Sequence, residues 1–573
     1  MPGRERRREA PNEASVSVPR PERDRLWERL QQGCDVLVVG GGITGAGVAL
    51  DAASRGYRVA LIDRGDYASG TTSRSTKLVH GGLRYLKQWQ FGLVREALHE
   101  RERLRRLAPH LVSPLSFVVP LYRETTRPLG IAIPPALRPF APFAVGAGLW
   151  GYDVLSRSDL RHRRLSPLDA RAAFPDLRTD TLRAAFLYHD ALTDDVRLTH
   201  AVLATARGFG ATTMNYVEAT ALDTGRPVRI MLKDHLSRAS MTIEARHVVN
   251  ATGVWAEEVA ARSGSGAFHI ERSKGVHLVL AAPHSLQHAL VIPETDDGRL
   301  AFAVPWRGRL ILGTTDNPYA GDPDAPVTTA AEVAYLLEHF NRYLTRPVHA
   351  PDVMAAFAGL RPLVRRGGAR SAALSRSHEV VDHANGLVSI LGGKLTTYRQ
   401  MAEDTVDVLV RRDGRRIACR TRTLVIDGGE QPEETAGALA AAVADAGLPA
   451  ETASHLYRTY GARGQRILAL AREPGLAQPL VPDLPTLAVE VVSGCREEQL
   501  VSLTDFMFFR SRLAILDRGH GRDAVATIVA LMTEELGWTA AEQTGQVAAY
   551  EDVLARETAF MQAAHREGSH GAT

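Results

Sequence analysis

The chain has 573 residues, too many for one hydrophobic core, so two or more packed units are expected. Hydrophobic residues make up 45% of it, charged residues 23%, and the formal net charge is +4, as in an ordinary globular protein. So small a net charge argues against nucleic acid as a partner, because nucleic-acid binding needs positive charge concentrated on one face. Cys34, Cys419 and Cys495 form no C-x-x-C pair, so no disulfide framework, iron–sulfur cluster or other metal site is predicted.

Residues 1–33 are predicted to form a charged, disordered tail. The first ten, M-P-G-R-E-R-R-R-E-A, contain no apolar stretch, which argues against a secretory signal. Residues 1 to about 24 hold too little apolar surface to pack, so a solvated tail is favoured over a basic arm that contacts anionic lipid. The chain has no run of 18 apolar residues, and no membrane-spanning helix is predicted.

A glycine-rich turn follows the first predicted strand. Residues 35–39 (D-V-L-V-V) and 58–63 (R-V-A-L-I-D) read as buried strands on either side of a predicted helix. Between the first strand and that helix, residues 40–45 (G-G-G-I-T-G) have the G-x-G-x-x-G spacing, which allows a tight turn and close approach of a diphosphate to the helix N-terminus. Asp63 ends the second strand, where a carboxylate can accept from a ribose hydroxyl. The four features together predict a dinucleotide site.

Two later predicted strands also end in glycine, at 247–253 (H-V-V-N-A-T-G) and 387–393 (L-V-S-I-L-G-G). Glycine-ended strands so far apart indicate one nucleotide-binding domain over residues 34–415, interrupted by insertions at about 85–190 and 255–355 that form a second lobe. A nicotinamide cofactor would use only the first strand–helix–strand unit. A longer cofactor, FAD, also accounts for the later strands and for the polar run T-T-S-R-S-T-K at 71–77.

From about residue 420 the apolar residues recur at helical spacing. Segments 453–461 and 498–514 show this clearly, and a helical C-terminal domain is predicted over 420–565.

Residues 139–152 (P-F-A-P-F-A-V-G-A-G-L-W-G-Y) carry no charge. Fourteen residues are too few to span a bilayer, so the segment suits either a buried helix or one that lies at a membrane surface. Composition alone slightly favours the buried helix.

Several stretches match the pattern of a known family. They are G-G-G-I-T-G-A-G (40–47), S-T-K-L-V-H-G-G-L-R-Y-L (75–86), G-T-T-D (313–316), G-L-R-P-L (359–363), G-G-K-L-T-T-Y-R (392–399) and Y-R-T-Y-G (457–461). In these the chain resembles the FAD-dependent, quinone-linked glycerol-3-phosphate dehydrogenases, which belong to the D-amino-acid-oxidase-like flavoproteins. The resemblance implies an α/β fold: a Rossmann-type FAD-binding domain interleaved with an α+β substrate lobe, followed by an all-α C-terminal domain.

The resemblance also implies partners. It implies non-covalent FAD, sn-glycerol 3-phosphate as electron donor, dihydroxyacetone phosphate as product and a membrane quinone as acceptor. Since no spanning helix is predicted, a lipid-soluble acceptor implies peripheral attachment to the cytoplasmic face of the membrane, with segment 139–152 as the candidate contact. A homodimer is left open.

The cofactor-binding residues expected from these motifs are Gly40, Gly41, Gly42, Ile43, Thr44, Gly45, Asp63, Arg64, Thr72, Ser73, Ser75, Lys77, Gly81, Gly82, Leu83, Val217, Thr252, Gly253, Gly393, Lys394, Leu395 and Thr396.

Cationic side chains at motif positions are expected to hold the substrate, because a phosphate dianion is best held by arginine forks. These are Arg84, Arg361 and Arg376, together with Lys394. Lys394 is one of only five lysines among 69 basic residues, and it is expected, with Arg361, to stabilise charge during the reaction.

Oxidation of a secondary alcohol also needs a group that takes the hydroxyl proton. His277 is preferred for this role over His80, and a reaction without a discrete base remains an alternative. Two rival functions also remain: an oxidase that passes electrons to oxygen, and a non-catalytic flavin-binding membrane scaffold. An amine or hydroxyacid oxidase is disfavoured, because it needs no phosphate cradle.

Overall fold

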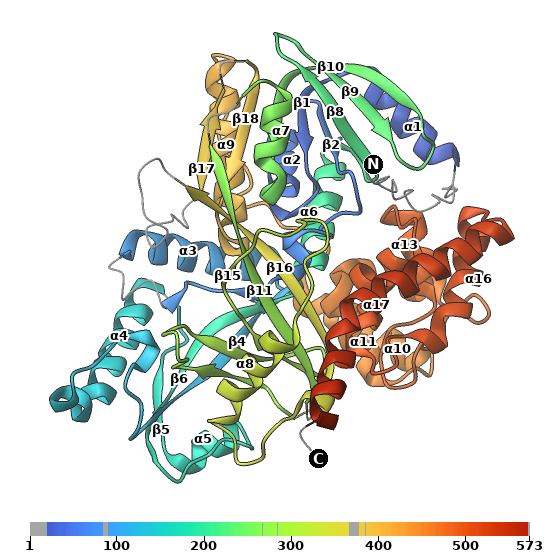
Figure 1. Cartoon of the computed structure of the whole chain (residues 1–573). Coiled ribbons are helices and arrows are strands. Elements are labelled where there is room, and N and C mark those ends of the chain that lie inside the picture. Colours follow the sequence, from blue (N-terminus) through green and yellow to red (C-terminus); the bar gives the residue numbers. More distant parts are fainter. Residues whose placement is uncertain are drawn as a thin grey trace, which may run out of the picture.

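The computed structural model describes residues 20–83, 90–156, 158–265, 268–282, 285–365, 378–383 and 385–570. Within these ranges the chain forms two β-sheets, each with its own helices, and a C-terminal domain of helices that packs beside both (Figure 1). The predicted fold class is confirmed.

The first sheet brings the glycine-ended strands side by side. Strand β1 (Cys34–Val39) lies parallel to both β2 (Val59–Ile62) and β10 (Ser240–Asn250), and β10 lies parallel to β18 (Leu387–Leu391). Because these strands are parallel and in register, their carboxyl ends meet at one edge. The sheet is completed by β7 (Thr212–Met214) beside β2, β17 (Glu379–Asp382) beside β18, and the hairpin of β8 (Val217–Asp223) and β9 (Val228–Asp234) beside β10.

Helix α2 (Ile43–Ser54) follows the glycine turn and packs against α6 (Asp195–Gly208) and α9 (Tyr398–Arg412). Its small residues permit this close packing: a Cβ added at Gly47 would lie 2.8 Å from the Tyr398 ring. A short helix, α7 (Ala256–Arg262), follows β10 through η5 (Gly253–Trp255).

The prediction of a disordered tail to residue 33 is wrong for its last part. Residues Arg20–Gln31 form helix α1. It is held to the first sheet because Leu30 is buried and because the Arg23 guanidinium pairs with Asp234 at 2.7 Å. Residues 1–19 of the predicted tail lie outside the described residues.

The second sheet forms the other lobe, and it is mostly antiparallel. Two long strands, β11 (His269–Ala281) and β16 (Val353–Arg365), pair along their lengths, as do β4 (Val112–Tyr122) and β6 (Leu182–Thr193). The other strands are β3 (Leu78–Val79), β5 (Arg163–Leu165), β12 (His288–Ile292), β13 (Ala301–Trp306), β14 (Arg309–Gly313) and β15 (Asn317–Pro318). Its helices include α3 (Phe91–Leu107), α5 (Pro167–Ala173) and α8 (Ala330–Asn341), with η3 (Pro128–Gly130) and η6 (Ala350–Asp352) in the loops.

The uncharged segment 139–152 does not form a buried helix. Helices η4 (Pro135–Phe140) and α4 (Ala141–Ser156) pack on the second lobe through Leu149 and Tyr152, which are 1% exposed. Their outer side is apolar and open to solvent, with Phe143 80% and Trp150 64% exposed. The composition could not reveal this arrangement, because both faces of the helix are apolar.

The C-terminal domain contains α10 (Pro432–Asp445), α11 (Ala450–Tyr460), η9 (Gly461–Arg463), α12 (Gly464–Leu470), α13 (Val489–Glu497), α14 (Leu503–Asp505), η10 (Phe506–Arg510), α15 (Leu513–Leu516), η11 (Arg522–Ala524), α16 (Val525–Leu536) and α17 (Ala540–His570). The predicted helix at 498–514 is broken: a π-helical turn, η10, is followed by Arg512 with a left-handed φ of 66°. Over the described ranges, no helix is long and apolar enough to cross a membrane.

Candidate active site

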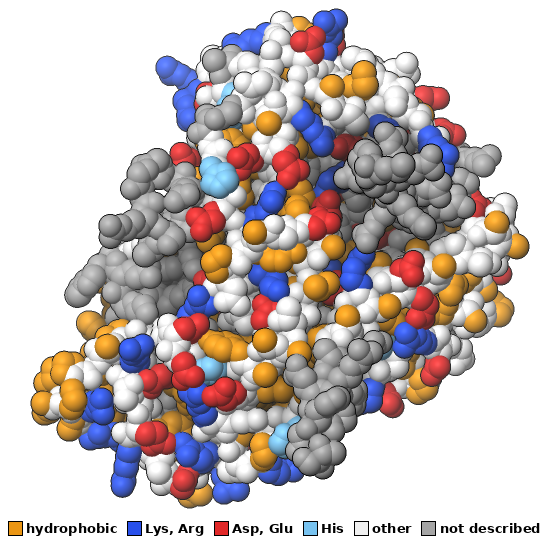
Figure 2. Space-filling model, viewed as in Figure 1, with side chains coloured by type: hydrophobic (Ala, Val, Ile, Leu, Met, Phe, Trp, Pro, Cys, Tyr) orange, Lys and Arg blue, Asp and Glu red, His pale blue; other side chains and the backbone are white. Residues whose placement is uncertain are grey.

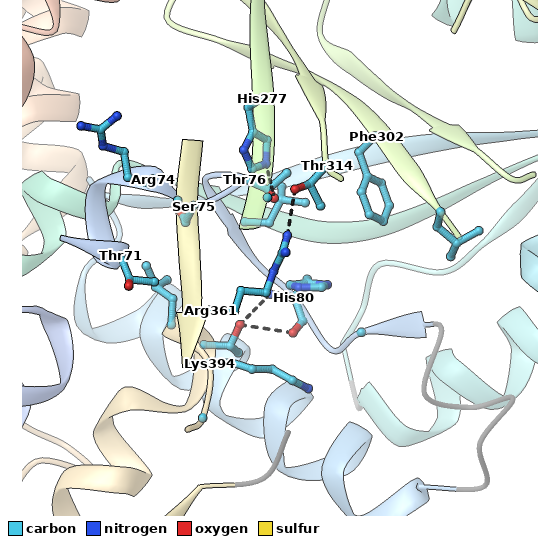
Figure 3. A pocket seen from close by; sticks show the side chains of 18 of the residues that line it. Thr71, Arg74, Ser75, Thr76, His80, His277, Phe302, Thr314, Arg361 and Lys394 are labelled. Atoms are coloured by element: carbon cyan, nitrogen blue, oxygen red, sulfur yellow. Dashed lines mark hydrogen bonds between the residues drawn. The ribbon is translucent and has the colours of Figure 1, made fainter. Parts of the chain in front are cut away.

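A cavity of about 240 Å³ lies where the glycine turn after β18 of the first sheet meets the second sheet. Its walls come from η1 (Thr71–Arg74) and the residues after it, from β11 and β16, and from the turn between β18 and η8 (Leu395–Thr397). Figure 3 shows His277 at one side of this cavity, Lys394 at the opposite side and the Arg361 side chain between them.

The glycine turn after β1 is built so that only glycine fits. Gly40 has a φ of 109°, and a Cβ there would lie 2.6 Å from the Ala251 carbonyl oxygen. At Gly45 a Cβ would lie 1.8 Å from the Gly40 carbonyl oxygen, so close that the two atoms would overlap. Gly42 is the N-cap residue of α2, and Thr44 lies in its first turn. The backbone of this turn can therefore approach a diphosphate without interference from side chains.

Asp63 follows β2 beside this turn, as the spacing predicted. Its carboxylate accepts from the Gly41 N–H (2.6 Å) and the Gly65 N–H (2.9 Å). Burial raises the pKa of Asp63 to about 6, despite these two donors. A hydroxyl pair that donated to the carboxylate would lower this pKa again.

Other predicted cofactor residues surround the turn. Thr72 Oγ1 accepts from the Ile43 N–H at 3.1 Å, which ties η1 to the start of α2. The Val217 N–H donates to the Asp63 carbonyl at 2.7 Å. The Arg64 guanidinium stacks over Trp255, 4.7 Å from the ring centroid.

After β10, the Thr252 hydroxyl donates to Asn250 Oδ1 at 2.6 Å. Gly253 has a left-handed φ of 62°, which turns the chain into η5. This second glycine turn stands beside the first, because a Cβ at Gly40 would also contact Thr252 Cα.

Two predicted side chains are directed at an acidic partner. Ser75 lines the cavity and its hydroxyl donates to Asp195 Oδ2 at 2.6 Å. Lys77 is fully buried, and its ammonium group donates to the same carboxylate oxygen (2.6 Å) and to the Ser73 carbonyl (2.5 Å). Lys77 and Ser73 are not among the residues that line this cavity, so a contact between them and the cofactor stays a prediction.

The H-G-G-L motif lies at the cavity wall. His80, Gly82 and Leu83 line the cavity, whereas the Gly81 N–H donates to the Tyr152 hydroxyl at 3.0 Å, away from the lining. Arg84 lies outside the described residues, as does Arg376.

The turn after β18 reaches the cavity with its backbone and one lysine. Gly393 has a φ of 82°, and Lys394 is the N-cap residue of η8. Both line the cavity with Leu395 and Thr396. The Thr396 hydroxyl oxygen accepts from the His80 N–H at 3.0 Å, so this turn and the H-G-G-L motif are joined.

Arg361 reaches the cavity from β16 and is held in place by the G-T-T-D stretch. Its guanidinium donates to Thr314 Oγ1 (2.8 Å), to the Thr315 carbonyl (3.1 Å) and to Asp316 Oδ1 (3.2 Å). A Cβ at Gly275 would lie 2.3 Å from Arg361 Nη2, so that glycine provides the room for the guanidinium.

His277 lies on β11, with Nε2 2.8 Å from Thr76 Oγ1. Its ring stacks on Phe357 at 5.0 Å between centroids, and Nδ1 has no hydrogen-bond partner among the described residues. Burial, with the positive charges of Arg361 and Lys77, holds the pKa of His277 well below its usual range, so the ring is neutral at pH 7.

The sequence interpretation missed several lining residues. Thr76 lay inside the quoted 71–77 run and Thr314 inside the G-T-T-D stretch, but neither motif said which side chains would turn inward. Asp316 of the same stretch supports Arg361 without lining the cavity. An apolar wall was missed altogether, since no motif marks it. It consists of Leu78, Tyr188, Val291, Leu300 and Phe302.

The residues present fit FAD. The glycine turns leave space for backbone contact only, the Asp63 carboxylate stands beside the N-terminus of α2, and the turn at Gly393 leads from the same sheet edge to the cavity. This is the sequence of contacts that a diphosphate, a ribose and a flavin ring require. Among the described residues no group of acidic, histidine or cysteine side chains could hold a metal ion.

Comparisons with known proteins agree with this geometry. Residues 35–399 match the family model for FAD dependent oxidoreductase, and residues 419–543 match the one for the C-terminal domain of alpha-glycerophosphate oxidase. The chain is 36% identical over 544 residues to glycerol-3-phosphate dehydrogenase 2 of Mycobacterium tuberculosis, covering 92% of this chain and 89% of that one. It is 37% identical over 533 residues to the mitochondrial glycerol-3-phosphate dehydrogenase of Mesocricetus auratus, covering 88% and 71%.

A solved structure is similar over nearly the whole chain. The glycerol-3-phosphate dehydrogenase from Bacillus halodurans, complexed with FAD, superimposes with a TM-score of 0.75 at 28% identity, covering 94% of this chain and 98% of that one. The extent and identity of these matches go beyond a shared fold. The chain belongs to the FAD-dependent oxidoreductase family, in the branch of the glycerol-3-phosphate dehydrogenases, and FAD is its cofactor.

Proposed function

We propose that the protein oxidises sn-glycerol 3-phosphate to dihydroxyacetone phosphate and passes the electrons to a membrane quinone. The observation that carries the proposal is the meeting of two cations and a neutral imidazole, Arg361, Lys394 and His277, at one cavity beside the predicted flavin site. A small alcohol that bears a phosphate dianion matches these groups in charge. The names of the similar proteins supply the identity of that alcohol.

Arg361 is assigned to the substrate anion. Thr314 and Asp316 hold its guanidinium at the cavity, where its positive charge can pair with the phosphate dianion. Arg84 and Arg376 stay predictions for the same role, because they lie outside the described residues.

His277 is assigned to the proton of the C2 hydroxyl. A neutral ring can take up a proton at Nε2, which lies 2.8 Å from Thr76 Oγ1, so the proton of the substrate would reach this nitrogen through the Thr76 hydroxyl, which passes on its own proton as it receives the other. Bound FAD supplies the hydride acceptor. The low pKa of His277 in the protein makes it a weak base, and the alternative of an alkoxide stabilised by Arg361 and Lys394 is tested by His277→Asn. Loss of about a hundredfold or more in the rate of flavin reduction supports the base, and a rate within about threefold of wild type supports the alternative.

The proposed reaction is tested most directly by the flavin absorbance. The purified holoprotein, kept free of oxygen, is titrated with sn-glycerol 3-phosphate, glycerol and a 2-hydroxy acid. Bleaching by the phosphate ester alone is expected, because glycerol has no anion for Arg361 and Lys394, and a 2-hydroxy acid has only a singly charged carboxylate in place of a phosphate dianion. Bleaching by none of them would support a non-catalytic flavin-binding protein, and bleaching by the hydroxy acid would support the other oxidase class.

The quinone acceptor is proposed because the second lobe carries an apolar surface suited to a bilayer. We call it the α4 patch; its members are Ile131, Leu137, Phe140, Phe143, Trp150 and Val154, which are 48–80% exposed. Figure 2 shows hydrophobic side chains gathered at the end of the molecule where α4 lies in Figure 1. Arg127 and Arg138 stand beside it and can contact anionic headgroups. Such a surface fits a protein attached to the cytoplasmic face of the cell membrane.

A paired substitution tests this attachment. Phe143→Glu with Trp150→Glu is expected to release the protein from anionic liposomes and to slow reduction of a lipid-bound quinone, while a soluble dye is still reduced. Both side chains are mostly exposed, so the fold should remain intact. Met231→Glu, on β9 of the first sheet and also exposed, is the control. Wild-type oxygen consumption that exceeds quinone reduction would favour the oxidase instead.

A further inference from the structure

The C-terminal helical domain makes buried hydrogen bonds and ion pairs to the segment that forms one wall of the cavity. This segment, 66–77, runs from just after Asp63 to Lys77. At its start, Arg510 pairs with the Asp66 carboxylate at 2.6 Å, and both side chains are buried. Next to it, the Tyr67 hydroxyl donates to Gln499 Oε1 at 2.6 Å. Both partners belong to the C-terminal domain.

A third contact reaches a cavity-lining residue itself. Arg74 lines the cavity, and its guanidinium donates to Glu557 of α17 at 2.9 Å. Glu557 is 7% exposed, so the contact is shielded from solvent. Arg74 also packs closely on β16, because a Cβ added at Gly359 would lie 2.4 Å from Arg74 Cβ.

The fourth contact passes through one carboxylate. Arg512 donates to Asp195 Oδ1 at 2.7 Å, and the other oxygen of that carboxylate accepts from Ser75 and Lys77 at 2.6 Å each. All of these groups except Ser75 are 0–2% exposed. A buried carboxylate that is shared between cations holds them at fixed positions, because each charge would be costly if left unpaired.

Backbone strain marks both ends of this link. Lys77 and Arg512 have left-handed φ angles of 63° and 66°, which are unfavourable for residues with a Cβ. Such conformations persist only where the surroundings impose them. Here the shared Asp195 provides that restraint at both residues.

The held segment touches the reacting groups. Between Ser75 and Lys77 stands Thr76, whose hydroxyl orients His277 Nε2. The Lys77 ammonium group also lies 5.1 Å from the centroid of the Phe357 ring on which His277 stacks. A displacement of residues 75–77 would therefore reach the imidazole by two routes.

We propose that Arg512 is a positioning residue for the reaction, which acts through Asp195 on residues 75–77, and that the C-terminal domain holds the cavity wall in its reactive arrangement. Arg512 itself does not line the cavity, so it contacts neither substrate nor the reacting atoms. The inference rests on the proposed function only for the choice of reductant.

The test uses the full-length holoprotein with Arg512→Gln, compared with Arg522→Gln. Arg522 is a matched control: it lies in the same domain and pairs with Glu551, but both side chains are largely exposed. Hydrogen–deuterium exchange of peptides over 66–80 is expected to quicken by about fivefold or more in Arg512→Gln alone. The limiting rate of flavin reduction by sn-glycerol 3-phosphate should fall by about tenfold or more, with half-saturation changed by less than about threefold.

Each result either supports the proposed role of Arg512 and the C-terminal domain or overturns it. Faster exchange over 66–80 with a wild-type reduction rate overturns the proposal, and so does an unchanged exchange pattern. If Arg512→Gln does not fold, Glu557→Gln takes its place, since it releases only Arg74 and is expected to slow reduction by about threefold or more; a wild-type rate there overturns the proposal as well. If wild-type protein is not reduced by sn-glycerol 3-phosphate, the proposed function fails, and the exchange measurement still tests the restraint.

Discussion

The two sides of the site are built by different means. The first sheet offers the turns after β1, β10 and β18, where glycines leave room for a ligand against the backbone; of these turns, which we call the glycine wall, the one after β18 lines the cavity. The wall from the second sheet consists of side chains on long antiparallel strands, where the pairing register sets His277 of β11 opposite Phe357 of β16, and Arg361 opposite Ser273. We expect the backbone turns to hold the part of the cofactor that is common to many enzymes, and the side chains to hold what is specific to one reaction.

The difference predicts separable failures. Substitutions in the glycine wall should remove the cofactor, because added atoms occupy its space. Substitutions in the side-chain wall should leave the cofactor bound and change rate or affinity for the substrate.

The largest effect is expected from Gly45→Ala. A Cβ there would lie 1.8 Å from the Gly40 carbonyl oxygen, and neither backbone segment can yield without opening the turn between β1 and α2. We expect the purified variant to contain no FAD, measured as flavin absorbance per chain. Gly437→Ala in α10, where nothing lies within 4 Å of the added Cβ, is the control and should remain fully yellow. Full flavin content in Gly45→Ala would contradict the expectation that the glycine wall holds the cofactor.

Lys394 sharpens the comparison, because it extends from the glycine wall yet is expected to act through its side chain. Lys394→Met should retain FAD and lose about 2–4 kcal/mol of transition-state stabilisation, a rate loss of about thirtyfold to a thousandfold. Lys394→Arg should recover little, since the planar guanidinium needs more room than a compact ammonium group. Lys233→Met on β9, an exposed position, is the control. Stopped-flow reduction of Lys394→Met within about threefold of wild type would contradict the role assigned to this lysine.

The glycine wall could be predicted from the sequence more completely than the side-chain wall. The spacing of residues 40–45 and of Asp63 predicted a tight turn with a carboxylate beside it, and both are present, because a turn between neighbouring elements is encoded by adjacent residues. The space for Arg361 depends on Gly275, which is 86 positions away along the chain and adjacent only because β11 pairs with β16. A contact between residues so far apart leaves no pattern in the neighbouring residues of the sequence. The partner of Lys77 could not be predicted for the same reason, because the Asp195 carboxylate that accepts from it is distant in sequence.

Asp63 gives a pH-dependent test of the glycine wall. With a pKa of about 6 in the FAD-free protein, its carboxyl group takes up a proton as the pH falls from 7 to 5. Since the ribose hydroxyls bind the ionised form, the affinity for FAD should fall by about tenfold over that interval. Asp63→Asn should bind FAD more weakly at pH 7 and lose this dependence. Equal pH dependence in both proteins, measured by flavin fluorescence during binding, would assign the proton to another group.

The smallest effect is expected from Asp316→Asn, which tests whether the side-chain wall needs its own supports. Asp316 accepts from the Arg361 guanidinium at 3.2 Å and from the Ser273 hydroxyl, and both members of the ion pair are partly exposed. Losing a charge pair of this kind costs about 1 kcal/mol, so half-saturation by sn-glycerol 3-phosphate should rise about fivefold. FAD content should stay at wild type, and the limiting rate of flavin reduction should change by less than about twofold. Asp223→Asn, which removes an exposed pair with Arg229 on the β8–β9 hairpin, is the control and should alter neither quantity. A fall in FAD content in Asp316→Asn would show that the two walls depend on each other and would end their separation.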